Sequence, residues 1–134
     1  MEVKEKFIFW NKEAKRALAV AGDLFRIKRY VEALFFGHLA LEKLLKAKII
    51  KVTKGDPVYS HDLVILAKYA EFTLDEDDIS FLARVNIYNI RARYQDYKRS
   101  LSKRADKEFT SEELSKIKKF FHRINDKTKY KTNS

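Results

Sequence analysis

The chain has 134 residues, of which 46% are hydrophobic and 36% charged, so it can bury a core and is too apolar to be an intrinsically disordered segment. It contains no cysteine, which excludes disulfides, thiol nucleophiles and cysteine-based zinc sites. The net charge of +10 favours a polyanionic partner such as nucleic acid, nucleotide or an acidic protein, although a merely solvated basic surface would give the same count.

Turn residues are scarce, with only three Gly and one Pro, and this predicts helices rather than a sandwich or barrel. Charged residues interrupt every long apolar stretch, and the Lys/Glu-rich start does not resemble a signal peptide. We therefore expect a cytoplasmic protein that makes no membrane contact. The net charge is uneven along the chain: it is +7 over residues 1–55, −6 over 56–82 and +9 over 83–134.

Two long amphipathic helices are expected first, over residues 4–25 and 30–52, where apolar residues recur at steps of three and four. The basic stretch 26–29 interrupts this period and suits a turn. Gly55 and Pro57 mark the end of the second helix.

Shorter helices should follow. Ser60 is a candidate N-cap for a helix over residues 61–71. Thr73 and Glu76 have the spacing of a capping box, as do Thr110 and Glu113, so each pair predicts the start of a helix.

Residues 95–108 are polar and basic, which indicates a loop or a frayed helical extension. The whole pattern predicts an all-α, antiparallel up-and-down bundle of four to five helices in one domain, residues 1–126. A polar tail over residues 127–134 is expected to be disordered. We expect no metal and no cofactor, since the acidic run 75–78 is explained by the dipole of a helix N-terminus.

Three segments carry a resemblance to a known family: HLALEKLLKA at residues 38–47, HDL at 61–63 and YNIRARYQD at 88–96. In this order they resemble the HEPN (higher eukaryote and prokaryote nucleotide-binding) family, in which a His-x-Ala-x-Glu-Lys helix, a His-Asp-Leu turn and an Arg-Tyr-Pro-Asp helix end follow one another. The resemblance covers about residues 5–125. It implies a helical bundle that binds nucleotide or RNA beside a small nucleotidyltransferase, in a toxin–antitoxin-like or nucleotide-transfer pair, and commonly as a homodimer.

This sequence departs from the family pattern in two places. Gln95 stands where the family usually has Pro, so the preceding helix could continue. HEPN ribonucleases have an Arg and a His separated by four to six residues, whereas here the positions at that spacing from Arg91 and Arg93, residues 96–100, contain no His. Metal-independent RNA cleavage needs a group that titrates near neutrality. The resemblance therefore favours a binding module, with a ribonuclease that uses His38 or His122 as the alternative.

The candidate phosphate-binding residues are Arg91, Arg93, Tyr94 and Asp96. Two arginines with a neighbouring tyrosine can hold a phosphate by paired hydrogen bonds and stack on a base. The alternative is an internal lock between Arg93 and Asp96, three residues apart on a helix.

His38 completes the candidate site, because a His one turn before Glu42 could have its imidazole oriented for proton transfer. The alternative is a core-edge histidine that is hydrogen-bonded locally, as buried polar groups usually are. For His61 and Asp62 we expect a structural role, bracing a turn and interacting with a helix dipole. Phe35, Phe36 and Phe81 are candidates for an apolar dimer face.

Overall fold

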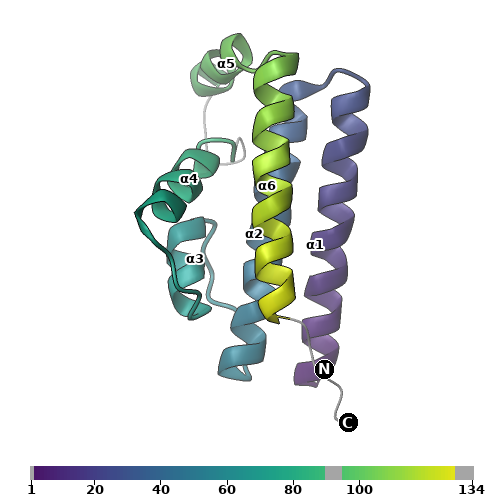
Figure 1. Cartoon of the computed structure of the whole chain (residues 1–134). Helices are drawn as coiled ribbons and strands as arrows, with labels where there is room; N and C mark the ends of the chain where they lie inside the picture. The colour runs from purple at the N-terminus through teal and green to yellow at the C-terminus, as the bar shows by residue number, and fades with distance from the viewer. Residues whose placement is uncertain (1, 90–94, 129–134) are drawn as a thin grey trace.

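The computed structural model describes residues 2–89 and 95–128, with the side chains of residues 2–89 and 99–126. The expected all-helical bundle is confirmed (Figure 1). Over the described ranges it has six helices rather than four or five, in part because the basic stretch after residue 94 forms a helix of its own. The helices are α1 (Val3–Arg26), α2 (Tyr30–Thr53), α3 (Leu63–Tyr69), α4 (Glu76–Asn86), α5 (Gln95–Arg104) and α6 (Lys107–Thr128).

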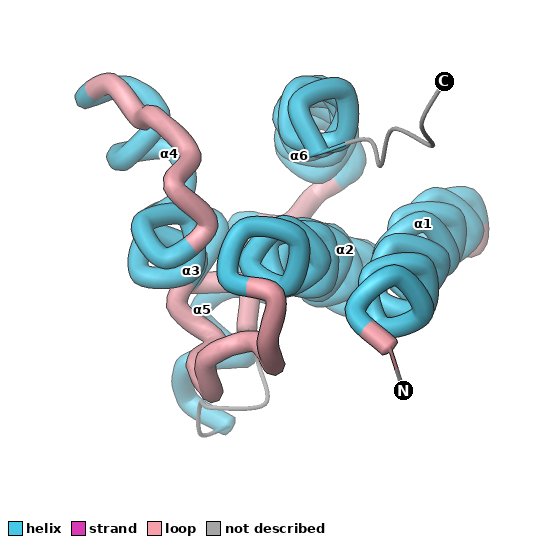
Figure 2. Tube along the Cα trace, turned by 90° about the horizontal axis from the view of Figure 1, so that it is seen from below, coloured by secondary structure: helices cyan, strands magenta, loops and turns pink. Residues whose placement is uncertain are grey.

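The central helix is α2, which lies between α1, α6 and α3 when the bundle is viewed along its length (Figure 2). Its buried residues point in all directions around the helix, as is expected for a helix enclosed by neighbours. α1 runs antiparallel to both α2 and α6, while α3 and α4 form a second layer on the other side of α2 (Figure 1).

Small residues set the spacing of the long helices. The inner face of α1 is made largely of alanines, namely Ala14, Ala17 and Ala21, which lets its backbone approach α2. Gly37 of α2 has the same role toward α6, because a Cβ placed there would lie 2.8 Å from Cδ1 of Ile117. Removing a side chain at the crossing point lets the two helices pack closely.

The starts of the short helices differ from the expected ones. The N-cap of α3 is Asp62, whose side chain accepts hydrogen bonds from the backbone N–H groups of residues 64 and 65, and Ser60 instead accepts from the Asp62 N–H. The capping box of α4 is formed by Asp75 and Asp78, two residues beyond the expected pair. Both positions still satisfy the rule that short acceptors cover the exposed N–H groups of a first turn.

The second expected capping box is also wrong. α6 begins at Lys107, where the Asp106 side chain accepts from the Phe109 N–H at 2.8 Å. Thr110 and Glu113 are therefore inside the helix, and both are buried. α6 extends to Thr128, two residues into the expected tail. None of the described helices is long and apolar enough to cross a membrane.

Candidate functional site

A row of three polar side chains lies along one buried side of α2. His38, Glu42 and Lys46 follow one another at intervals of four residues and are 0%, 3% and 7% exposed. The Lys46 ammonium donates to Oε2 of Glu42 at 3.1 Å, and Nδ1 of His38 lies 3.8 Å from Oε1 of the same carboxylate. Buried charges are stable when paired in this way.

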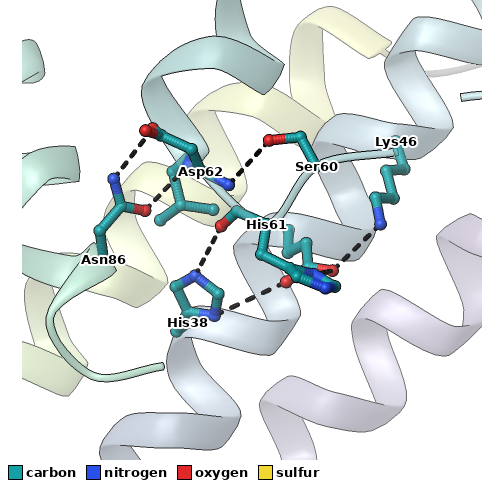
Figure 3. Close-up of polar contacts among 8 residues, drawn as sticks. His38, Lys46, Ser60, His61, Asp62 and Asn86 are labelled. Carbon is teal, nitrogen blue, oxygen red and sulfur yellow. Dashed lines mark hydrogen bonds and ion pairs between the residues drawn. The ribbon is translucent and has the colours of Figure 1, made fainter. Parts of the chain in front are cut away.

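The connection from α2 to α3 folds back onto this row (Figure 3). Nε2 of His38 lies 3.1 Å from the main-chain carbonyl oxygen of His61, and since a carbonyl only accepts, Nε2 carries the proton. Nδ1 of His61 lies 2.9 Å from Oε2 of Glu42. Two of the family-like motifs, HLALEKLLKA and HDL, therefore meet in space and fix the loop before α3.

The loop in turn holds the end of α4. The side-chain amide of Asn86 donates to Oδ1 of Asp62 at 3.0 Å, and its carbonyl oxygen accepts from the Leu63 N–H at 2.9 Å (Figure 3). Asn86 is the last residue of α4, so the start of α3 and the end of α4 are joined by two hydrogen bonds.

A second buried contact fixes the same end of α4 from the side of α6. Glu113 accepts from Nε of Arg84 at 2.8 Å and from the hydroxyl of Tyr88 at 2.5 Å. Burial alone would raise the pKa of Glu113, but the hydrogen bonds from Arg84 and Tyr88 lower it below its usual value. Burial, together with the bond to Glu113, raises the pKa of Tyr88. The tyrosine therefore remains a neutral donor to an ionised carboxylate.

The start of α4 is also held to α6. Asp78 accepts two hydrogen bonds from the guanidinium of Arg123, both at 2.7 Å. These bonds lower the pKa of Asp78. The Arg123 guanidinium also lies 5.0 Å above the ring of Phe120, so it has a carboxylate and an aromatic face as neighbours. Both ends of α4 are thus fixed to the long helix α6.

These contacts locate the segment that carries the expected phosphate-binding residues. It follows the end of α4, which is held by the loop through Asn86 and by α6 through Arg84 and Tyr88. Arg91, Arg93 and Tyr94 themselves lie outside the described residues, and Asp96 belongs to α5 without a described side chain. Their role in binding phosphate stays a prediction.

His38, the fifth expected site residue, has no exposed surface in the described structure. It holds the loop carbonyl, as the alternative of a locally bonded histidine predicted. His122 is exposed and lines a groove of about 530 Å³ between α1 and α6, together with Arg26 and Lys118. The structure therefore does not bring His38 and His122 together in one site.

Sequence reasoning missed the contact between Glu113, Arg84 and Tyr88, because Glu113 was assigned to a capping box. A signal was present, since Glu113 lies four residues before Ile117, on the inner stripe of its helix, and a carboxylate there requires a buried partner. Within the described parts of the chain, no three His, Asp or Glu side chains are grouped in a way that could hold a metal ion.

Fold and site together define a class: an all-helical bundle whose histidine-containing motifs brace the loop between its second and third helices. A model of the HEPN domain matches residues 8–129, nearly the whole chain. The chain therefore belongs to the HEPN domain family, which is generally associated with nucleotides or RNA. Neither a curated protein nor a solved structure matches it significantly.

Proposed function

We propose that this chain is a HEPN module that binds the phosphate groups of a nucleotide or RNA through Arg91 and Arg93, with Tyr94 stacking on a base and Asp96 orienting an arginine. The match to the HEPN domain over residues 8–129 carries the proposal. His38 contributes indirectly, through the loop that it braces.

The anchoring of α4 supports this proposal. A binding group acts best when the element before it has a fixed position. The last turn of α4 is held on two sides, by hydrogen bonds from Asn86 to Asp62 and from Arg84 to Glu113, and Tyr88 just beyond it also donates to Glu113, so the segment that follows starts from a fixed point.

The test measures binding of a fluorescently labelled single-stranded RNA, and of a labelled ATP analogue, to the full chain. The double variant Arg91→Gln/Arg93→Gln should lose at least about tenfold in affinity for one of them, since each arginine makes charge-assisted contacts. Lys12→Gln/Lys68→Gln, which removes two exposed lysines from α1 and α3, is the charge-matched control. Equal affinities for the two double variants would contradict the proposal.

We further propose that the module acts beside a small nucleotidyltransferase, as one half of a toxin–antitoxin-like pair, and that it forms a homodimer. The expected results are co-purification with a protein that transfers nucleotides, and a mass by light scattering of twice 15.9 kDa for the chain alone. A monomer that purifies without any nucleotidyltransferase activity would contradict both parts.

A further inference from the structure

One end of the bundle combines basic residues from two distant parts of the sequence (Figure 1). Lys28 and Arg29 lie in the turn between α1 and α2. Lys103, Arg104 and Lys107 lie at the end of α5 and the start of α6. All five are exposed, and we call them the basic end.

The two segments are adjacent in space. They line a common hollow of about 270 Å³, to which the turn contributes Lys28 and Arg29, the start of α2 contributes Tyr30, and α5 contributes Ser102. The hollow is smaller than the roughly 300–1,000 Å³ of sites that enclose a whole organic ligand. It suits a small anionic group such as a phosphate, for which ammonium, guanidinium and hydroxyl groups are donors.

Within the described part of the chain, the cations of the basic end are not held by a carboxylate; exposed lysines such as Lys12 and Lys68 are not either, so the grouping of its cations is what distinguishes the basic end. Arg84 and Arg123 are each held by a carboxylate, Glu113 and Asp78 respectively. Among the described residues, the ion pairs include none of the five cations of the basic end.

Three carboxylates lie close by in the sequence. Glu32 lines the hollow, Asp106 is used as the N-cap acceptor of α6, and Glu108 is exposed. Five cations against three carboxylates still leave an excess of positive charge. Cations within about 8–10 Å of one another reinforce a common potential at physiological salt.

From this grouping we infer that the basic end is a second phosphate-binding surface, which contacts phosphate groups of the same ligand outside the Arg91 and Arg93 segment. The inference rests on the proposed function. A ligand that extends over several phosphates, such as an RNA strand, would be held at both places, whereas a free nucleotide would use one of them. The hollow would take one phosphate, with Arg29 and Lys28 on one side and Ser102 on the other.

The experiment compares three double variants of the full chain: Lys28→Gln/Arg29→Gln, Lys103→Gln/Arg104→Gln and the control Lys12→Gln/Lys68→Gln. Glutamine keeps the length of each side chain and removes its charge. Affinity for labelled single-stranded RNA is measured between 50 and 200 mM salt, and circular dichroism checks that each variant is folded. Each basic-end variant should bind RNA about tenfold more weakly. Its plot of log affinity against log salt concentration should also be less steep by about 1.4, which is about 0.7 for each of the two lost phosphate contacts. The control should stay within about twofold of the parent.

Equal weakening of all three variants would show a general effect of net charge and would overturn the inference. The inference would also be overturned if poly-glutamate displaced RNA as efficiently as polyphosphate of equal charge does, because that result would identify an acidic protein as the ligand. A labelled ATP analogue distinguishes the two phosphate sources: lost ATP binding in the basic-end variants indicates a free nucleotide, and lost RNA binding alone indicates a strand.

The Arg91→Gln/Arg93→Gln variant separates this inference from the proposed function. If only that variant weakens RNA binding, the inference fails and the proposed function stands. If only the basic-end variants weaken it, the inference stands and the assignment of Arg91 and Arg93 fails. A parent chain that binds neither RNA nor ATP would overturn both.

Discussion

His38 shows how one residue can fit two hypotheses until its neighbours are known. In the sequence it sits in an apolar row one turn before a glutamate, which suits either proton transfer or a packed histidine. The folded chain supplies a carbonyl acceptor from His61 and a carboxylate from Glu42, so the ring is buried and bonded. Any influence of His38 on phosphate binding must therefore pass through the loop that it holds.

Glu42 is the residue on which this brace depends, since its carboxylate contacts Lys46 and His61. Glu42→Gln removes the negative charge and leaves a buried ammonium without compensation, so unfolding in urea should show a loss of about 3 kcal/mol. Glu13→Gln is the control. Its carboxylate lies 3.9 Å from Lys43 at a more exposed position, and an exposed pair contributes less than about 1 kcal/mol. Similar losses in the two variants would contradict the role given to Glu42.

At the scale of the element, the first residues of α4 and α6 show which features local sequence predicts and which depend on contacts with distant residues. Several short acceptors within a few residues could cap α4 or α6, and local spacing favoured Thr73 and Thr110. Asp75 and Asp106 are the residues used. For α6 the reason is tertiary: Glu113, which the expected box required, is bonded to Arg84 and Tyr88 instead.

The crossing of α2 and α6 gives an element-scale prediction. Gly22→Ala in α1 should stabilise the protein by up to about 1 kcal/mol, because alanine is the better helix former and its Cβ would be 3.7 Å from the nearest atom, Nη1 of Arg26. The free energy of unfolding of the Gly37→Ala variant should be about 1 to 3 kcal/mol lower than that of the Gly22→Ala variant. The Cβ added at position 37 would meet Ile117, whose side chain is fully buried and has no room to move. Equal thermal shifts in the two variants would mean that this crossing is loosely packed.

At the scale of the whole molecule, buried polar contacts connect the two layers of the bundle. α2 holds the loop before α3, this loop holds α4, and α4 is bonded to α6 at both of its ends. The apolar core gives the bundle its stability. The polar contacts favour this arrangement of the short helices, because moving α4 away from α6 would separate the buried carboxylate of Glu113 from Arg84.

The ties between α4 and α6 predict acid sensitivity. In the folded protein the pKa values of Asp78 and Glu113 are lowered from their usual values of 3.8 and 4.5. The two carboxylates therefore stabilise the fold at a pH above these usual values, and this contribution is lost as the pH falls through the lowered pKa values of the folded protein. Asp78→Asn/Glu113→Gln should be less stable at pH 6, and its further loss between pH 6 and pH 3 should be smaller than the parent's by on the order of 1 kcal/mol. Denaturant unfolding at both pH values measures this difference.

Asp77→Asn/Glu112→Gln is the control for that measurement, since both carboxylates are exposed on the same two helices. It should keep the pH dependence of the parent chain. The same pH dependence in both double variants would place the acid-sensitive groups elsewhere.

The sequence alone determined the helical class, the extent of the first two helices and the family, because apolar periodicity and short motifs are local properties of the chain. It also identified the residues of the loop brace, His38, Glu42 and His61, without showing that they meet. Only the tertiary structure decided which polar groups pair, how α4 is held by α6, and that the α1–α2 turn lies beside α5. These are contacts between residues far apart in the chain, and helical periodicity carries no information about them.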